Sequence, residues 1–295
     1  MTICSNMKLK FYNIAIPALL LAGCGLNSQA QKVTDLQEVS ISAPHSIKVD
    51  GKNFEWEGVN FSDNKRTNIS YLICNDDKNL YLIVKSSDVV NNTKIMAGGI
   101  TFSVNPDGKK KEKESITLTY PVINRANMRG GGRGMMRMGG PSGGVNSVKQ
   151  RDSMMAAMQK TQLAQAKEIK IKGFKNTADT LVSIYNEYGI KAFANIEKDN
   201  SYFYEMAIPL EALGLTKDSS KEFAYNIKLN GLQLPGLDGG FGGGGNRGGG
   251  GNRGGFTVGG GGGGGGFGPP RGGGFDFQSL ISPTDFWGKY TLTTK

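Results

Sequence analysis

The stretch TNISYLICNDDKNLYLIVK, residues 67–85, holds two apolar runs separated by a short polar segment. In the first run Ile69, Tyr71 and Ile73 occupy alternate positions, so their side chains point to one face of a strand. The polar segment NDDKN between the runs is rich in Asp and Asn, which favour turns. The stretch therefore predicts a β-hairpin.

The same alternation recurs along the chain in short segments separated by polar turns. These segments are GGITFSV, SITLTY, EIKIKG, LVSIYN, IKAFANI, YFYEMAI, EFAYNIKL and WGKYTL. Roughly ten short strands of this kind favour an antiparallel sandwich over a sheet with helical crossovers. We expect an all-β fold, a jelly-roll or immunoglobulin-like β-sandwich, formed as a single domain by residues 45–295.

Helix signals are scarce. The segment Val148–Lys167 is rich in Met, Ala, Gln and Lys, which are good helix formers, and it predicts one helix on the surface or within a mobile insertion. A shorter turn of helix is expected at Leu210–Leu215, directly after Pro209.

Glycine accounts for 45 of the 295 residues and is concentrated in two segments that lie between predicted strands. Such segments cannot bury enough apolar surface to offset the entropy lost on ordering. We therefore expect two flexible loop insertions, at residues 124–166 and 236–281, because loops tolerate added length at small cost in stability.

The N-terminus has the pattern of a secretory signal peptide. Lys8 and Lys10 precede the apolar run IAIPALLLAG, which is too short to span a bilayer. The run ends in Leu-Ala-Gly-Cys at residues 21–24, which resembles the lipobox of bacterial lipoproteins and implies cleavage before Cys24 and lipidation of that residue. Residues 1–23 are then the signal peptide and 24–44 a lipidated tether. Cleavage after Ala30 is the alternative, and it would release a secreted or periplasmic protein.

The predicted location is therefore the bacterial cell envelope, with the outer membrane as the expected membrane and the lipid as the contact with it. With Cys24 acylated, Cys74 is the remaining cysteine of the mature chain, so an intrachain disulfide is excluded. Its place at the end of a predicted strand favours a small buried hydrophobic role.

The formal net charge of +10 raises the question of an anionic partner such as nucleic acid. The glycine-rich stretch 239–274 contains Arg247, Arg253 and Arg271 between phenylalanines, as in RNA-binding segments. Its charge density is low, however, and an exported protein rarely meets cellular RNA. We expect no nucleic-acid partner and interpret the stretch as a flexible loop.

The order of several short motifs resembles carbohydrate-binding modules of family 9 and the related DOMON domains. The matching segments are VDG at 49–51 with Trp56, DDKNLYL at 76–82, ITFSVNPDG at 100–108, YEMAIPL at 204–210 and SPTDFWGKYTL at 282–292. The resemblance implies a β-sandwich with a binding role, often to glycans and sometimes to haem. A haem site would require an axial ligand such as Met206. A calcium site at Asp50 or Asp88 remains an open alternative. No cofactor is predicted.

Members of this family that bind sugar clamp it between two exposed tryptophans. Trp56 and Trp287 are the two tryptophans of this chain, and core packing is the preferred interpretation for each. The candidate sugar-binding residues are Tyr185 and Tyr188, in the turn sequence YNEYG, together with Trp287.

Catalysis finds little support in the sequence. His45 is the one histidine, so a triad or a histidine metal site would depend on it alone. Asp76 and Asp77 are interpreted as turn formers, and Glu205 as an exposed or structural hydrogen-bonding residue. We therefore expect a non-catalytic envelope lipoprotein that binds a poly- or oligosaccharide. The alternatives are an envelope scaffold that contacts unknown protein partners and binds no sugar, and a haem-binding domain.

Overall fold

A computed structural model of the chain describes residues 35–123, 145–175, 177–217, 221–232 and 277–293. Contacts divide the chain into two units, residues 1–32 and 33–295, and every described residue lies in the second. Within this described part, no helix is both long and apolar enough to cross a membrane.

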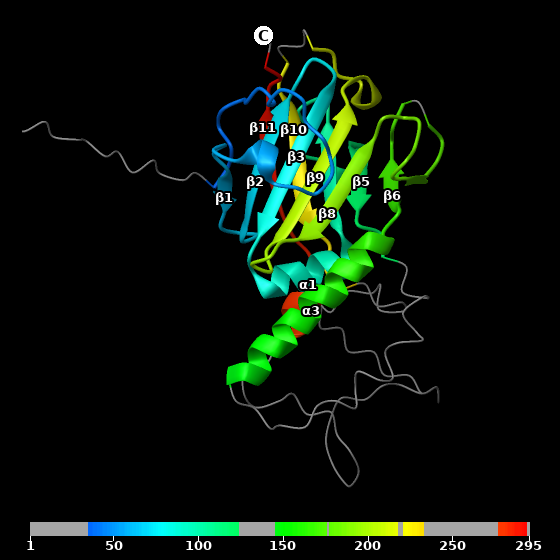
Figure 1. Ribbon diagram of the computed structural model, residues 1–295. Coiled ribbons are helices and arrows are strands. Elements are labelled where there is room, and N and C mark those ends of the chain that lie inside the picture. The colour runs from blue at the N-terminus through cyan, green and yellow to red at the C-terminus, as the bar shows by residue number, and fades with distance from the viewer. Residues whose placement is uncertain (1–34, 124–144, 176, 218–220, 233–276, 294–295) are drawn as a thin grey trace, which may run out of the picture. The chain divides into compact units, whose positions relative to one another are not determined.

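The described residues form two antiparallel sheets that pack as a sandwich (Figure 1). The five-stranded sheet has the order β1 (Ser62–Asn64), β2 (Ile69–Asn75), β3 (Asn79–Ser86), β9 (Tyr202–Pro209), β8 (Lys191–Ile196). The six-stranded sheet has the order β11 (Thr284–Tyr290), β10 (Phe223–Leu229), β4 (Ile100–Asn105), β5 (Ile116–Tyr120), β6 (Glu168–Lys172), β7 (Leu181–Ser183). The predicted all-β sandwich is confirmed, and the predicted hairpin is β2 paired with β3.

The main core lies between the two sheets. Alternate residues of each strand point inward, so Tyr71 and Ile73 of β2 face Phe102, Tyr225 and other apolar side chains of the opposite sheet. Tyr71 and Tyr225 bring their hydroxyl groups within 3.0 Å of each other, which satisfies both polar atoms inside an apolar layer.

The outer face of the five-stranded sheet is also buried, because residues 37–61 lie across it. Ala43 and Trp56 of this segment pack on Leu72 and Cys74 of β2 in a second apolar cluster. Gln37 is buried as well, and its side chain accepts from the Ile73 N–H and donates to the Ile73 carbonyl. The tether predicted at residues 24–44 is therefore not free along its whole length, because residues 37–43 belong to the sandwich.

Helix is more abundant than the sequence predicted. In the described part of the chain the α-helices are α1 (Val89–Gly98), α3 (Val145–Gln165) and α4 (Phe277–Ile281), and Figure 1 shows α1 and α3 at the same end of the sheets. The 3₁₀ turns are η1 (Phe54–Trp56), η2 (Glu112–Glu114) and η4 (Glu211–Leu213), the last within the turn expected after Pro209.

The insertion expected at 124–166 is packed at its C-terminal end. Leu163, near the end of α3, and Ala166 are buried in the main core, and α3 packs against β8. Leu163 buries its side chain where α3 packs against the sheet. The C-terminal end of this largely polar helix is therefore part of the folded domain. Residues 124–144 of that insertion and 236–276 of the other lie outside the described residues.

Helix α1 was not predicted, although both of its ends carry ordinary signals. Asp88 is the N-cap and accepts a hydrogen bond from the Asn91 N–H at 2.8 Å, and Gly99 follows the helix with a φ of +77°. Between these ends the sequence VVNNT consists of weak helix formers, which conceal the helix from a propensity argument.

Candidate functional site

The turn between β7 and β8 carries two of the three predicted sugar-binding residues. Asn186 closes it: its side-chain N–H₂ donates to the carbonyls of Ser183 at 2.6 Å and Ile190 at 2.7 Å. Gly189 adopts a φ of +72°, a conformation that favours glycine. The turn passes from the six-stranded to the five-stranded sheet, so its backbone is fixed from both sides.

Beside this turn lies a pocket of about 270 Å³. Three loops build it: the β6–β7 loop, the β7–β8 turn, and the chain from the end of β9 into η4. Its lining residues are Phe174, Thr177, Glu187, Tyr188, Ile190, Pro209, Glu211 and Ala212. We call it the Tyr188 pocket.

The Tyr188 pocket has an apolar base and a polar rim. Phe174, Ile190 and Ala212 are buried in the main core and present apolar atoms to the pocket. The exposed side chains of Glu187 and Glu211 stand on the rim, and neither has a hydrogen bond or ion pair with another described residue. Both carboxylates are therefore free to accept hydrogen bonds from a ligand.

Tyr188 itself is half-buried, and its orientation is fixed. Its hydroxyl donates to the Asp179 carboxylate at 2.9 Å, and its ring packs against the main core. Because these contacts already restrict its rotamers, Tyr188 loses little rotamer freedom when a ligand binds in the pocket.

Tyr185 lies outside the pocket. Its side chain is 78% exposed, and the Lys167 ammonium lies 5.8 Å from its ring centroid. The two tyrosines share one turn but do not line one cavity.

Trp287 lies on a different part of the domain. It belongs to β11, and because Phe286 and Tyr290 point into the core, Trp287 points to the outer face of the six-stranded sheet, where it is half-buried. The core interpretation of Trp287 is therefore wrong. Strands β11 and β7 are the opposite edges of that sheet, about 24 Å apart at ordinary strand spacing, so Trp287 and the tyrosine turn do not form one site.

For Trp56 the core interpretation is confirmed. The side chain is 1% exposed, and its indole N–H donates to the Glu205 carboxylate at 2.6 Å. The same carboxylate accepts from the backbone N–H groups of Asp50 at 3.0 Å and Gly51 at 2.8 Å. Burial raises the pKa of Glu205 to about 7, although these three donors favour its ionised form. Glu205 thus holds residues 37–61, which we call the covering segment, on the five-stranded sheet.

The remaining candidates serve the fold. The Asp76 carboxylate accepts from the Lys78 and Asn79 N–H groups and from the Tyr81 hydroxyl, which confirms its role in the turn. Asp88 caps α1, and Met206 is buried in the core, where it accepts a hydrogen bond from the Tyr204 hydroxyl. Among the described residues no three His, Cys, Asp or Glu side chains are grouped to hold a metal ion.

Most of the Tyr188 pocket could not be found from the sequence. Phe174 and Thr177 precede the turn, while Pro209 and Glu211 follow it by about two strands. Glu187 stands beside Tyr188 in YNEYG and was the one available signal, since ligand pockets combine aromatic side chains with a few polar or charged groups. The predicted lipidation site, Cys24, lies outside the described residues.

The solved structures similar to this chain include two of carbohydrate binding module family 9 from Caldicellulosiruptor kristjanssonii. The one in complex with glucose is 9% identical, with a TM-score of 0.31, and the match covers 66% of this chain and 78% of that chain. The one in complex with cellotriose is 10% identical, with a TM-score of 0.30, and the match covers 66% and 76%. No family model and no curated protein matches the sequence. Both structures come from the family that the sequence resembles, but a likeness this distant assigns neither ligand nor site, and the β-sandwich follows from the two sheets themselves.

Proposed function

We propose that this domain binds carbohydrate and that the Tyr188 pocket holds one sugar unit of the ligand. The observation that carries the proposal is the combination, in one pocket, of a fixed aromatic ring, an apolar base and two unengaged carboxylates. A sugar has the complementary chemistry, since its C–H face is apolar and its hydroxyl groups donate hydrogen bonds.

In this proposal each group has one task. The ring of Tyr188 stacks on the C–H face of the sugar, while Glu187 and Glu211 accept hydrogen bonds from its hydroxyl groups. Thr177 supplies a hydroxyl that both donates and accepts. The pocket volume of about 270 Å³ limits the contact to a small part of a longer chain.

The test is calorimetry of the soluble domain against a panel of neutral oligosaccharides. We expect one class to bind and Tyr188→Ala to weaken that binding about tenfold, because stacking and burial of the sugar face are lost. Tyr188→Phe keeps the ring and should bind far better than Tyr188→Ala. Tyr185→Ala is the matched control, because it removes a tyrosine of the same turn that lies outside the pocket.

Two results would reject this function. One is a folded domain that binds no member of the panel, which would favour a scaffold that contacts other envelope proteins. The other is a Tyr188→Ala variant that binds as well as the wild type. We further propose binding without catalysis, so the bound sugar should be recovered unchanged in mass after long incubation.

We also propose that lipid on Cys24 anchors the domain to the cell envelope, with the outer membrane as its expected location. The support is the apolar run that ends in Leu-Ala-Gly-Cys. Cys24→Ala should abolish cleavage before residue 24 and attachment of the lipid, so the protein should keep the size of the precursor and take up no labelled fatty acid. Equal processing and equal fatty-acid labelling of both forms would reject the anchor.

A further inference from the structure

The outer face of the six-stranded sheet, unlike that of the five-stranded sheet, is polar. Its side chains form two rows that run across the strands from β11. The first row is Asp285, Lys228, Thr101, Thr119 and Lys170, and the second is Trp287, Asn226, Ser103, Thr117 and Lys172. We call these two rows the polar face.

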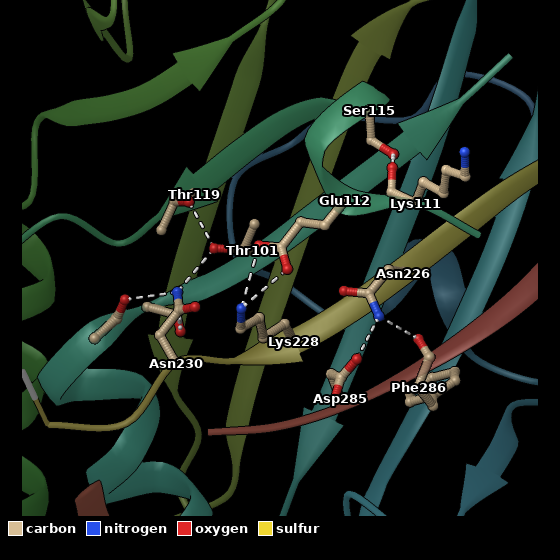
Figure 2. Close-up of polar contacts among 12 residues, drawn as sticks. Thr101, Lys111, Glu112, Ser115, Thr119, Asn226, Lys228, Asn230, Asp285 and Phe286 are labelled. Carbon is tan, nitrogen blue, oxygen red and sulfur yellow. Dashed lines mark hydrogen bonds and ion pairs between the residues drawn. The ribbon is translucent and has the colours of Figure 1, made fainter. Parts of the chain in front are cut away.

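Hydrogen bonds hold the middle of the polar face in place, as Figure 2 shows. The hydroxyls of Thr101 and Thr119 lie 2.7 Å apart, and the Asn230 side chain donates to Thr101 at 2.8 Å. The Asn226 side chain donates to the Asp285 carboxylate at 2.8 Å and to the Phe286 carbonyl at 2.9 Å. The surface is therefore already ordered before any partner binds.

The charges on the polar face are unequally engaged. Asp285 is bonded to Asn226 and lies 3.6 Å from the Arg66 guanidinium. Lys228 is paired with Glu112 of η2 at 3.2 Å. Lys170 and Lys172 are exposed, and neither has an ion pair or hydrogen bond with another described side chain. The free charge within the two rows is thus positive, while the free carboxylate of Glu168 lies one row beyond.

Ser103 adds an unused polar group at the centre of the second row. Its neighbours Phe102 and Val104 point into the core, so its side chain points to the polar face. The residue is 0% exposed, and its hydroxyl has no hydrogen-bond partner among the described residues. A buried hydroxyl without a partner is destabilising unless a water or a ligand group satisfies it.

We propose that the polar face binds an acidic polysaccharide chain that lies across the strands. The second row alone, from Trp287 to Lys172, spans four strand spacings, about 19 Å, which suits a chain and exceeds one sugar ring. Trp287 stacks on a sugar at one end of the row. Lys170 and Lys172 pair with carboxylate or sulfate groups, and Thr117 and Thr119 bond to hydroxyl groups between them.

This surface is separate from the Tyr188 pocket, whose unengaged rim groups are carboxylates and would repel an acidic chain. The inference therefore goes beyond the proposed function, and either could hold without the other. Variants of the two surfaces distinguish them.

The experiment is affinity electrophoresis and calorimetry of the protein with polygalacturonate, dextran sulfate and uncharged dextran. We expect one or both acidic polymers to bind and dextran not to. Lys170→Gln with Lys172→Gln, and separately Trp287→Ala, should each weaken binding about tenfold. Lys78→Gln with Lys198→Gln is the matched control: it removes the same charge from exposed lysines outside the polar face and should leave affinity within about twofold. Tyr188→Ala should have no effect.

Polygalacturonate and dextran sulfate separate carboxylate from sulfate recognition. Circular dichroism and urea unfolding of each variant exclude loss of fold as the cause of weaker binding. The proposal is overturned if the folded wild type binds neither acidic polymer, or if both lysine pairs weaken binding equally, since net charge alone would then explain it. It is also overturned if Tyr188→Ala abolishes binding, because the ligand would then occupy the pocket.

Discussion

At the scale of the residue, the two tryptophans show how position decides the role of one side-chain type. Trp56, within the covering segment, is buried against the five-stranded sheet and bonded to Glu205, whereas Trp287 stands half-buried on an outer face. Both occur in motifs that appear structural, so sequence motifs alone predicted core packing for both. Strand alternation places Trp287 on the outer face only once Phe286 and Tyr290 are known to face the core. The inward direction of these two residues is set by the pairing of β11 with β10, which the sequence alone does not give.

Replacing each tryptophan by phenylalanine should separate these roles. Trp56→Phe removes the indole N–H and leaves a buried oxygen of Glu205 with one donor fewer, so we expect the free energy of unfolding to fall by about 1–3 kcal/mol. Trp287→Phe should change it by less than about 0.5 kcal/mol. Urea denaturation monitored by circular dichroism measures both, and equal losses would contradict the assignment.

Glu205 should make stability depend on pH. Its pKa is raised from the ordinary value of 4.5 to about 7 because burial disfavours the charge. Between these two values the folded state binds more protons than the unfolded state, so the stabilising contribution is full below pH 4.5 and is lost as pH rises to about 7.

The variant Glu205→Gln does not titrate and serves as the reference. The stability of the wild type relative to this variant should fall between pH 4.5 and about 7 and then level off. Unfolding free energies measured for both proteins at several pH values give this difference. A difference that stays constant with pH, or rises, would show that the three hydrogen bonds to Glu205 outweigh its burial.

At the scale of the element, the strands and helix α3 were predictable from the sequence, whereas helix α1 was not. Period-2 patterns such as EIKIK identify β6 without ambiguity, because Ile169 and Ile171 are buried and the charged residues between them are exposed. Helix α1 escaped because its weak helix formers are stabilised by tertiary contacts, among them buried Ile95 and Met96. Helix α3 was predicted, but the packing of its end was not, because its anchor, Leu163, stands in the polar stretch KTQLAQ.

The packing of α3 can be tested by a pair of substitutions. Leu163→Ala removes a side chain that is 4% exposed, and we expect a loss of about 2–4 kcal/mol in unfolding free energy. Met155→Ala, on the same helix but 43% exposed, should cost less than about 0.5 kcal/mol. Chemical denaturation of both variants provides the measurement. A Leu163→Ala protein as stable as the wild type would mean that α3 rests on the sandwich without stabilising it.

At the scale of the whole sandwich, the five-stranded sheet is shared by two apolar clusters, one on each face. The sequence predicted the sandwich but not this arrangement. The order β1-β2-β3-β9-β8 places β3 beside β9, although the two strands lie more than a hundred residues apart in the sequence. Such long-range pairing depends on the packing of both faces of the sheet, so no local sequence pattern indicates it. The same limit applies to the Tyr188 pocket, which three separate loops complete.

Cys74 reports on the integrity of that shared sheet. Its thiol is fully buried in the outer cluster, and burial raises its pKa well above the usual range, so little reactive thiolate forms in the folded state. We expect alkylation of Cys74 by iodoacetamide to be slow in the native protein and fast in urea, as measured by mass spectrometry of its peptide. The alkylation rate should follow unfolding, and rapid labelling of the native protein would contradict the buried position.

The covering segment also brings the two ends of the sandwich together. The Ser40 hydroxyl donates to the carbonyl of Thr291, and the Ser42 hydroxyl donates to the side-chain hydroxyl of Thr293. A short linker could therefore join residue 293 to residue 37, with new termini opened in the long segment between β10 and α4, and the sandwich should still fold. In such a circular permutant the order of the strands along the chain changes while their order in space is kept.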